Sequence, residues 1–481
     1  MARKYHISFS MVDSLRRMCL GHTFSDVRLR SKKTPPCNDW LSSVYTPYHT
    51  IFCCHIFLQT IYFNRILVFI FSNIWNISFS ISLRMRRHSI STKELDQMKN
   101  YYDVIVVGLG IFGASALWRL ASKGKRVLGV DAGGPTHCFG SSHGSSRIFR
   151  RAYWEGEKYL PLLNHADTLW NELEAVAQRK LLFRTGGIFI GHSDSRVVKG
   201  STRTAKLSQI KHSLLTADKV CRHVPAFNIP HNFEALYEPG AYAISACDAR
   251  LTMLNEAVHQ GVVTLFGESV VSVKNNGAGA TLKTKNGNSY TAKSVIVTTG
   301  PWIAEQLLPE IKDYLETRKL PVYWFTPKTG SENIFSPENF PVFLYESSHG
   351  HLLYGVPSIV SNEPGVKIGF HNRQQIPTHP SWMEVQISQQ SIEEISTIVS
   401  PLLPDLERLP ARAKNCFYTM SKDESFLIGA STKLNSVYFA SACSGHGFKF
   451  ATAIGDALAH LVNGQDPSVS ISEFSPTRFW N

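Results

Sequence analysis

Three glycines in the first third of the chain have the spacing of a phosphate-binding turn: Gly108, Gly110 and Gly113, in the sequence Gly-Leu-Gly-Ile-Phe-Gly. The first permits a tight turn, the second lets the backbone approach a pyrophosphate, and the third lets a helix pack closely on a strand. A helix that begins at such a turn directs free amides and its positive dipole end towards the phosphates. Asp131 follows 23 residues after Gly108, where a carboxylate can accept hydrogen bonds from a ribose diol. The pattern predicts a dinucleotide site, but it does not separate FAD from NAD.

The residues around these glycines supply the elements that such a site needs. Residues 103–107 are a nearly continuous apolar run, as expected of a buried parallel strand. Residues 114–122 favour a helix, and residues 126–130 favour a second strand that ends at Asp131. Because strand, glycines, helix, strand and acid follow one another in the required order, the motif is more specific than three isolated glycines.

Further elements of an α/β fold are expected much later in the chain. Asn-Gly pairs at 276–277 and 286–287 bracket residues 280–284 and predict consecutive hairpins. The other expected elements are the end of a helix at 255–260, strands at 262–266, 294–298 and 437–441, and a helix at 447–462. The nucleotide-binding domain is therefore expected to consist of three separated pieces, with a second domain between them.

Composition excludes several other classes of protein. A hydrophobic fraction of 43% and a charged fraction of 18% describe an ordinary folded chain. Of the net charge of +13, a surplus of eight lies before Met98, so the rest is only mildly basic. That suits a small anionic ligand, and we expect no nucleic-acid partner. None of the nine cysteines forms a C-x-x-C pair, so we expect no metal site and mostly free thiols in a reducing compartment.

The first 98 residues differ from the remainder. Residues 51–83 are rich in Ile, Phe and Trp, and the 18 residues from 66 to 83 are long enough for a marginal membrane helix. Arg84, Arg86 and Arg87 follow as a cytoplasmic flank would. The alternative is an untranslated stretch carried into a gene model, with Met98 as the true start; a membrane association is expected only if the segment is real. The C-terminal tail lacks a Ser-Lys-Leu address, and we leave a cytoplasmic or peroxisomal location open.

Four further motifs occur in a fixed order: Gly-Ser-Ser-His-Gly-Ser-Ser-Arg-Ile-Phe-Arg at 140–150; Tyr-Gly-Val-Pro at 354–357 with Val-Lys-Ile-Gly-Phe-His at 366–371; Asn-Cys-Phe-Tyr-Thr at 415–419; and Ser-Gly-His-Gly-Phe-Lys-Phe at 444–450. From about Tyr101 to the C-terminus the chain resembles the monomeric sarcosine oxidase and N-methyltryptophan oxidase family, within the D-amino-acid-oxidase-like group of FAD-dependent oxidoreductases. The resemblance implies a monomer that binds FAD, takes a small amino-acid substrate and O2, and releases hydrogen peroxide.

The family pattern assigns roles to individual residues. Cys416 matches the cysteine that attaches the flavin covalently; a thiolate is the nucleophile required, and a locally lowered pKa of the thiol would favour it. Arg150 and Lys449 match the pair that binds the substrate carboxylate, through two hydrogen bonds and a point charge respectively. Lys367 matches the lysine that assists oxygen reduction, and His371 matches a substrate contact.

The resemblance also implies contacts with the cofactor. His143 and Arg147 are expected to polarise the flavin, and Tyr354 occupies a further catalytic position. The complete expected set of cofactor-binding residues is Gly108, Gly110, Ile111, Phe112, Gly113, Asp131, Ser142, His143, Arg147, Val271, Gly300, Cys416, Tyr418, Gly445, Gly447 and Lys449.

The implied fold is α/β, with a Rossmann-type FAD-binding domain and an interleaved substrate domain of antiparallel or mixed sheet. The FAD-binding domain is expected at 101–184, 245–305 and 421–475, and the substrate domain at 185–244 and 306–420, after an atypical extension at 1–98.

The implied reaction removes a hydride equivalent from the carbon beside a neutral amine, and the imine product is then hydrolysed. The substrate is left open among sarcosine, N-methyltryptophan, another N-methyl amino acid and the cyclic amine pipecolate. Ser145 replaces an acidic residue of the best-known bacterial members, and the loop from Tyr354 to Lys367 is slightly longer; both differences bear on the substrate. The run from Glu155 to Leu162 is closest to the N-methyltryptophan branch. Two alternatives remain: a flavin dehydrogenase with another electron acceptor, and a non-catalytic, membrane-tethered flavoprotein.

Overall fold

The computed structural model describes residues 100–480, except 138–139, 361–362 and 383–385. The segment at 51–83 and the proposed start at Met98 lie outside the described residues, so neither expectation is tested. Within the described part of the chain, no helix combines the length and the hydropathy needed to span a membrane.

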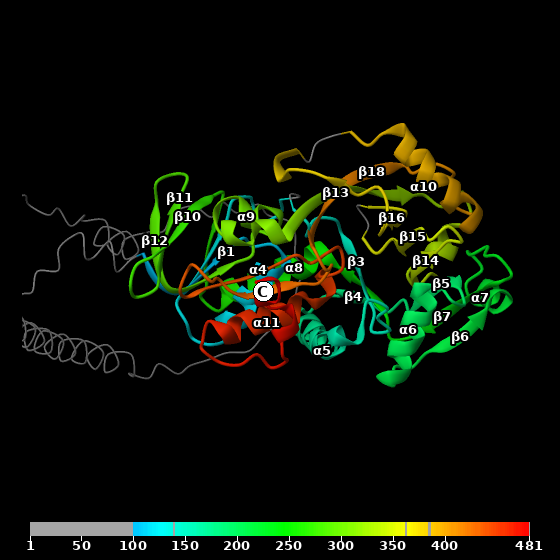
Figure 1. The fold of residues 1–481 in the computed structure, drawn as a ribbon. Coiled ribbons are helices and arrows are strands. Elements are labelled where there is room, and N and C mark those ends of the chain that lie inside the picture. Colours follow the sequence, from blue (N-terminus) through cyan, green and yellow to red (C-terminus); the bar gives the residue numbers. More distant parts are fainter. Residues whose placement is uncertain (1–99, 138–139, 361–362, 383–385, 481) are drawn as a thin grey trace, which may run out of the picture. The chain divides into compact units, whose positions relative to one another are not determined.

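The first sheet has eight strands and carries the nucleotide-binding turn (Figure 1). Its parallel part runs from β12 through β1 and β2 to β9, and β20 pairs in parallel with the other side of β12. An antiparallel meander, β10-β11-β12, extends it. The strands are β1 (Tyr101–Val107), β2 (Val127–Asp131), β9 (Val263–Phe266), β10 (Val270–Asn275), β11 (Ala280–Thr284), β12 (Ser289–Val297), β19 (Leu427–Ala430) and β20 (Val437–Ser441).

The apolar run of β1 is buried on both faces of this sheet. Val104 and Val106 belong to the hydrophobic cluster that includes helix α4 (Ile111–Ala121), whereas Ile105 and Val107 belong to the cluster that includes the meander. Alternate residues of a strand point to opposite faces, so a strand covered on both sides requires apolar residues throughout. Helix α4 packs against α8 (Ala246–His259) and α11 (Ala451–Leu461), and α11 packs against α5 (Leu160–Ala177).

The second sheet has nine strands and is mainly antiparallel. Its order is β17-β13-β16-β15-β14-β5-β7-β6, with β18 paired along β13. The bounds are β5 (Gly187–His192), β6 (Ser213–Thr216), β7 (Phe233–Glu238), β13 (Leu315–Phe325), β14 (Val342–Glu346), β15 (Leu352–Val356), β16 (Val366–Phe370), β17 (Ile376–Pro377) and β18 (Arg412–Ser421). Helices α6 (Arg196–Leu207), α7 (Ala217–His223) and α10 (Gln389–Leu402) belong to this part of the chain.

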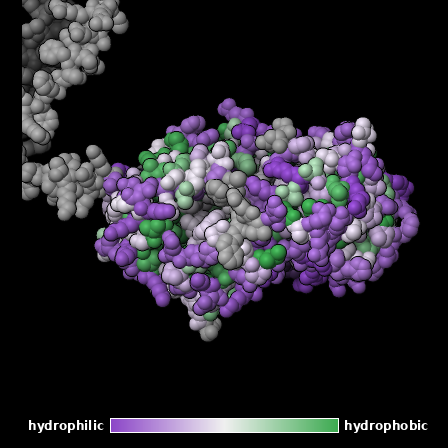
Figure 2. All heavy atoms as spheres, turned by 90° about the horizontal axis from the view of Figure 1, so that it is seen from above, coloured by the Kyte–Doolittle hydropathy of each residue, from purple (hydrophilic) through white to green (hydrophobic). Residues whose placement is uncertain are grey.

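A small three-stranded sheet, β3-β8-β4, completes the strands of the described residues. It contains β3 (Ser146–Phe149), β4 (Leu182–Phe183) and β8 (Tyr242–Ser245). The remaining helical pieces are α9 (Ile303–Gln306), η1 (Glu157–Tyr159), η2 (Gly300–Trp302), η3 (Pro309–Tyr314), η4 (Glu332–Phe335), η5 (Pro380–Trp382), η6 (Phe448–Phe450), η7 (Ser472–Phe474) and η8 (Pro476–Phe479). The visible face in Figure 2 is mainly hydrophilic, with hydrophobic residues in small separate groups.

The predicted α/β class is confirmed, and most predicted elements are found close to their expected bounds. The strand at 437–441 and both hairpins are correct. The helix expected at 447–462 is shorter, because residues 448–450 form a 3-10 turn and α11 covers only 451–461. Strands of the first sheet lie at 101–131, 263–297 and 427–441, in the three pieces predicted for the nucleotide domain. The domain boundaries themselves stay a prediction.

Candidate active site

The glycine turn between β1 and α4 has no room for side chains. Gly108 has a φ of +87°, and a Cβ there would lie 2.7 Å from the carbonyl oxygen of Thr298. A Cβ on Gly113 would lie 1.9 Å from the carbonyl oxygen of Gly108. Only glycine tolerates both this backbone conformation and this close approach. The amide of Ile111, at the start of α4, donates to Ser142 Oγ at 3.0 Å, so the predicted contact residue Ser142 lies beside the predicted phosphate site.

Asp131 lies at the end of β2, as predicted, and it supports the glycine turn directly. Its Oδ2 accepts from the Leu109 amide at 2.6 Å, and its Oδ1 accepts from the Gly133 amide at 2.7 Å. Burial opposes ionisation, but hydrogen bonds from His137 and from the two amides outweigh it and lower the pKa of Asp131. The carboxylate is therefore ionised at neutral pH and remains an acceptor for a ribose diol.

Several buried polar atoms near the turn have no hydrogen-bond partner within the described residues. A bound nucleotide would supply such partners. These atoms include Ser141 Oγ, Thr299 Oγ1 and Arg250 Nη2. Arg250, on α8, donates from Nε to the Leu109 carbonyl and from Nη1 to the Pro135 carbonyl, both at 2.6 Å. Because a buried donor without a partner is costly, these atoms fit a ligand rich in phosphate and hydroxyl oxygens. The residues therefore fit FAD.

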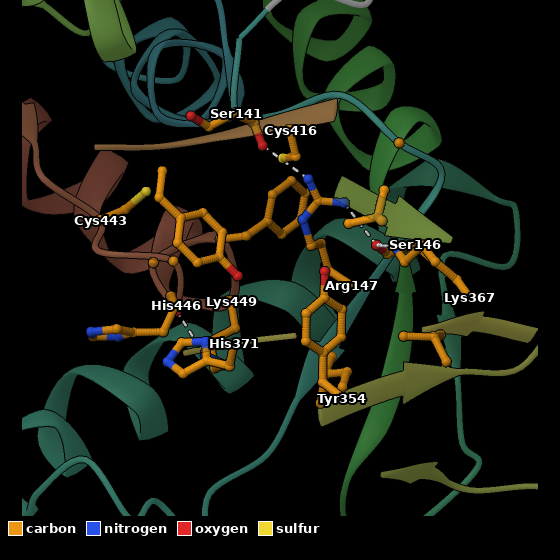
Figure 3. Close-up of a pocket in the computed structure, with 18 of the residues that line it drawn as sticks. Ser141, Ser146, Arg147, Tyr354, Lys367, His371, Cys416, Cys443, His446 and Lys449 are labelled. Carbon is orange, nitrogen blue, oxygen red and sulfur yellow. Dashed lines mark hydrogen bonds between the residues drawn. The ribbon is translucent and has the colours of Figure 1, made fainter. Parts of the chain in front are cut away.

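A cavity brings most of the other predicted residues together (Figure 3). Three of the predicted contacts not yet described lie away from its wall: Phe112 is in the first turn of α4, Gly300 begins η2, and Val271 is exposed on β10. The predicted residues that line the cavity are His143, Arg147, Arg150, Tyr354, Lys367, His371, Cys416, Tyr418, Gly445, Gly447 and Lys449.

The nine-stranded sheet positions one group of these residues through strand periodicity. Lys367 and Gly369 lie on β16, with His371 just beyond its end, and alternation places all three on one face. Tyr354 on β15 is in register with Gly369, and a Cβ on Gly369 would lie 2.8 Å from the Tyr354 hydroxyl oxygen. The glycine thus makes room for the tyrosine ring between the lysine and the histidine.

Cys416 and Tyr418 lie two residues apart on β18 and therefore on the same face of that strand. A Cβ on Gly445 would lie 2.3 Å from the Tyr418 ring, so this position also requires glycine. The surroundings of the Cys416 thiol do not lower its pKa. Burial penalises the thiolate and raises the pKa, and the nearby charges of Arg147 and Lys367 only partly offset this.

Arg147 organises the loop that precedes β3. Its guanidinium donates to the carbonyls of Ser141 at 2.9 Å, His143 at 2.6 Å and Ser146 at 2.8 Å. Lys367 Nζ reaches the same loop by donating to the Ser146 carbonyl, which joins β16 to β3. Burial, reinforced by Arg147, lowers the pKa of Lys367 to about 7. A cation is thus held beside the cavity at a pKa where it can both hold and release a proton.

Arg150 and Lys449 are both buried, on separate elements of the cavity wall. Arg150 follows β3 and donates from Nη2 to Glu155 Oε1 at 2.5 Å. Lys449 lies in η6 and donates from Nζ to the His446 carbonyl at 2.7 Å. Burial, then the charge of Arg150, lowers the pKa of Lys449 to about 7. Buried cations with so few acceptors can bind an anion strongly.

Three histidines of the wall are neutral at pH 7. Burial lowers the pKa of His143 and of His371 to about 4, and that of His446 to about 3. His143 Nδ1 lies 2.6 Å from the Gly140 carbonyl, which can only accept, so Nδ1 carries the proton and Nε2 can accept a hydrogen bond.

A family model described as "FAD dependent oxidoreductase" (DAO) matches residues 103–461, about three quarters of the chain. The chain belongs to this family. It is 34% identical over 382 residues to the monomeric sarcosine oxidase of Streptomyces avermitilis, covering 79% of this chain and 98% of that protein. It is 32% identical over 379 residues to the N-methyl-L-tryptophan oxidase of Yersinia pestis, covering 79% and 99%. The chain is therefore an FAD-dependent oxidoreductase of the sarcosine oxidase and N-methyltryptophan oxidase kind, and the predicted family is confirmed.

Solved structures agree on the fold of this family member. NikD, an amino acid oxidase essential for nikkomycin biosynthesis, matches with a TM-score of 0.69 at 21% identity, over 78% of this chain and 98% of its own. Glycine oxidase from Geobacillus kaustophilus matches with a TM-score of 0.66 at 18% identity, over 79% and 99%. These similarities support a Rossmann-type FAD-binding fold.

Sequence reasoning missed four residues of this family member's site: Trp154 and Glu155 at the cavity, His446 beneath Lys449, and Arg250 beside the glycine turn. Glu155 and His446 lie inside runs that the sequence singled out, but nothing in those runs indicated their partners. Arg250 lies on a helix without a motif, so the sequence carried no signal for it.

Proposed function

We propose that this chain is an oxidase of N-methyl or cyclic secondary amino acids, which oxidises the C–N bond to an imine and reduces O2 to hydrogen peroxide. The observation that carries the proposal is the pair of buried cations, Arg150 and Lys449, in the same cavity as Cys416 and Lys367. A carboxylate is the anion that such a pair would select, and the FAD-dependent family supplies the redox chemistry.

Arg150 and Lys449 would hold the substrate by its carboxylate and so fix the position of its α-carbon. A guanidinium presents two parallel donors to a carboxylate, while the ammonium contributes a compact charge. In the structure the Arg150 guanidinium is paired with Glu155, so a substrate carboxylate would compete for it or share it. Orientation of the reacting bond is then set by residues whose own partners hold them rigidly.

His371 would contact the amine. Burial keeps it neutral at pH 7, so a ring nitrogen can accept a hydrogen bond from the amine. No side-chain hydrogen bond to another described residue is found for this imidazole, although it lies edge-on to Trp154 and tilted towards Tyr418. The reaction requires the neutral amine, because an ammonium has no lone pair to support loss of a hydride equivalent.

We propose FAD attachment at Cys416, where the family pattern has its flavin-linked cysteine. When bound, FAD supplies the acceptor for the two electrons that leave the substrate. Lys367 would place its positive charge where negative charge develops on oxygen. A pKa of about 7 allows Lys367 to supply a proton in the same step.

Peroxide release and oxygen consumption by the full chain test this proposal, with sarcosine, N-methyltryptophan, L-pipecolate, proline and glycine as substrates. We expect turnover of at least one secondary amine, with glycine inert, and one peroxide per oxygen consumed. Anaerobic bleaching of the flavin by an amine without oxygen consumption in air would overturn the oxidase and indicate another electron acceptor. Absence of bleaching with every amine would overturn the substrate class.

A further inference from the structure

Part of the cavity wall is apolar and has no role in the proposed reaction. Leu344 on β14 and Leu352 at the start of β15 are both buried and line the cavity. Trp154 lines it too and packs against the hydrophobic cluster that contains both leucines. We call Trp154, Leu344 and Leu352 the apolar wall.

The apolar wall is adjacent to the residues that would hold the substrate. Trp154 precedes Glu155, the partner of Arg150, in the sequence. Its ring lies edge-on to the His371 ring, with centroids 6.2 Å apart and an interplanar angle of 89°. The amide of His371 donates to the Leu352 carbonyl at 2.7 Å, which ties the same histidine to a second member of the wall. A substituent on the substrate's α-carbon would therefore meet this wall.

Trp154 is held in place from behind. A Cβ on Gly200 of α6 would lie 3.0 Å from the Trp154 Cβ, so helix and tryptophan are already in close contact. The Arg196 guanidinium, at the start of α6, lies 5.6 Å from the centre of the Trp154 ring and covers it. The indole cannot withdraw towards α6 to make room, and its cavity-facing surface is a fixed feature of the site.

We propose that the apolar wall is the subsite for an apolar side chain or ring on the substrate's α-carbon. The inference rests on the proposed function and narrows it: the substrate is a secondary amino acid with an apolar substituent, and sarcosine, which has none, is a poor substrate. Sarcosine would leave the wall in contact with water, whereas a ring would bury it. Each methylene buried in an apolar pocket changes kcat/KM by about 10-fold or more.

Binding of acids without an amine tests the subsite independently of turnover. Acetate and cyclohexanecarboxylate are titrated into the FAD-loaded full chain, and affinity is measured from the change in flavin absorbance. We expect cyclohexanecarboxylate to bind at least about 10-fold more tightly than acetate, and Trp154→Ala to reduce that ratio by about 10-fold while leaving acetate unchanged. Trp154→Phe should restore most of the preference. Leu207→Ala, on the exposed side of α6, is the matched control and should behave as the unmodified chain.

Equal affinity for the two acids, tighter binding of acetate, or a gain in ring affinity on Trp154→Ala would each overturn the subsite. Should Trp154→Ala fail to fold, Trp154→Phe and Leu344→Ala give the same comparison of the two acids. Kinetics complete the test: kcat/KM for L-pipecolate or N-methyl-L-phenylalanine should exceed that for sarcosine. A chain that binds the ring acid selectively but oxidises no amine would refute the proposed function and leave the subsite intact.

Discussion

The Tyr153 hydroxyl oxygen lies 2.6 Å from His446 Nδ1, and the tautomer of this buried imidazole decides which of the two atoms donates. His446 Nε2 lies 3.1 Å from the Glu424 carbonyl, which can only accept, so Nε2 carries the proton. Because burial lowers the pKa of His446 to about 3, the ring is neutral and Nδ1 accepts from Tyr153. The carbonyl of the same histidine accepts from Lys449. Tyr153 and His446 therefore position one of the two proposed carboxylate-binding cations.

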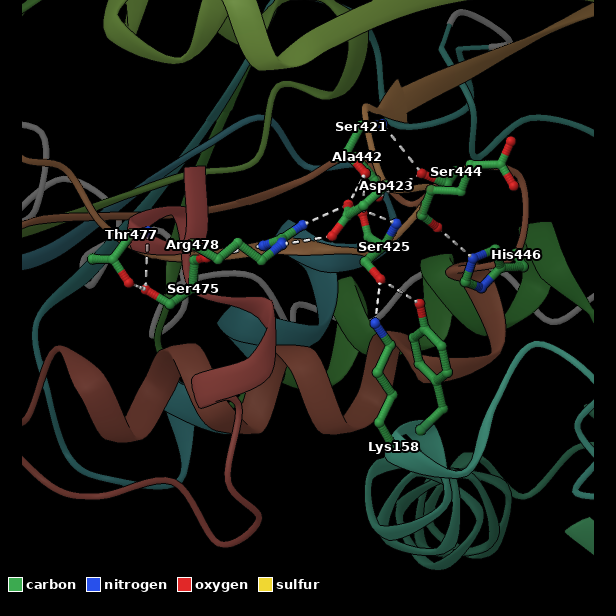
Figure 4. A network of polar contacts seen from close by, with 12 residues as sticks. Lys158, Ser421, Asp423, Ser425, Ala442, Ser444, His446, Ser475, Thr477 and Arg478 are labelled. Carbon is green, nitrogen blue, oxygen red and sulfur yellow. Dashed lines mark hydrogen bonds and ion pairs between the residues drawn. The ribbon is translucent and has the colours of Figure 1, made fainter. Parts of the chain in front are cut away.

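The loop at 421–425 anchors this arrangement from the outside (Figure 4). Arg478 of η8 donates to both carboxylate oxygens of Asp423, at 2.8 and 3.0 Å. Lys158 donates to Ser425 Oγ at 2.6 Å, and the Glu424 carbonyl faces His446 from the same loop. Arg478, near the C-terminus, is thus connected to Lys449 through Asp423, its neighbour Glu424, and His446.

Tyr153→Phe should weaken carboxylate binding without affecting later steps. The substitution removes the hydrogen bond to Nδ1 and leaves a buried acceptor unsatisfied, so His446 and then Lys449 lose their fixed position. We expect the dissociation constant for cyclohexanecarboxylate to rise by about 10-fold, with kcat nearly unchanged. Tyr290→Phe, on the partly exposed strand β12, is the control. A fall in kcat with unchanged acid affinity would contradict the positioning role.

Carboxylate affinity should depend on pH through Lys449. Its pKa is lowered to about 7, chiefly by burial, so Lys449 is protonated below that pH and loses its positive charge as the pH rises through it. The dissociation constant for cyclohexanecarboxylate should therefore increase between pH 6 and pH 9. Because this acid has no amine, its own ionisation does not change over that range and does not contribute to the pH profile. Lys449→Met should bind the acid more weakly at pH 6 and give a flatter profile. An unchanged slope in this variant would assign the titration to another group.

The turn and the parallel strands were predictable from the sequence because local rules dictate them. Glycines in a fixed order and an apolar run such as 103–107 reflect backbone sterics and two-sided burial. The motif residues were predictable through resemblance alone, since Cys416, Lys367 and Arg150 are far apart in the chain. The pKa of Cys416 could not be predicted, because it depends on burial in a hydrophobic cluster formed by residues of β13 and β18. The pairing of Tyr153 with His446 could not be predicted either, because it joins residues 293 positions apart.

Lys367→Met should slow the reaction of reduced enzyme with oxygen and spare reduction by the amine. The lysine is buried and joins β16 to the loop at Ser146, so it lies where a fixed charge acts in a low-dielectric site. Loss of one such electrostatic contribution should reduce the rate of reoxidation by about 100-fold or more. Stopped-flow absorbance measures the two half-reactions separately, and Lys433→Met, on the surface, is the control. Equal slowing of both half-reactions would assign Lys367 a structural role instead.

Cys416→Ser should yield protein that releases its flavin on denaturation, whereas the unmodified chain should retain it. Cys443→Ser is a matched control, since Cys443 lines the same cavity and burial also raises the pKa of its thiol. Because the pKa of Cys416 is raised, attachment to added FAD should proceed faster as the pH increases and more thiolate forms. Intact mass and acid precipitation measure attachment. Retention of flavin by Cys416→Ser and its loss from Cys443→Ser would reverse the assignment.

Glu155→Gln should lower the stability of the folded chain and raise its affinity for a carboxylate. Burial raises the pKa of Glu155, but the charges of Arg150, His446 and Lys449 outweigh this effect and bring the pKa to about 2, below its ordinary value of 4.5. A depressed pKa means that the stabilising contribution is present above about pH 4.5 and is lost as the pH falls towards 2. Breaking a buried ion pair costs about 3–5 kcal/mol, so the midpoint of thermal unfolding at pH 7 should fall.

The same substitution removes a negative charge beside Arg150 and Lys449, so an incoming carboxylate no longer competes with Glu155. The dissociation constant for cyclohexanecarboxylate should therefore decrease, although the folded chain is less stable. Scanning calorimetry and the flavin absorbance titration measure the two effects on one preparation. Glu238→Gln, which alters another buried carboxylate that accepts from the amides of Arg151 and Ala152, should lower stability without tightening acid binding. Weaker acid binding by Glu155→Gln would instead show that Glu155 orients the guanidinium for the substrate, and that its charge assists rather than opposes the carboxylate.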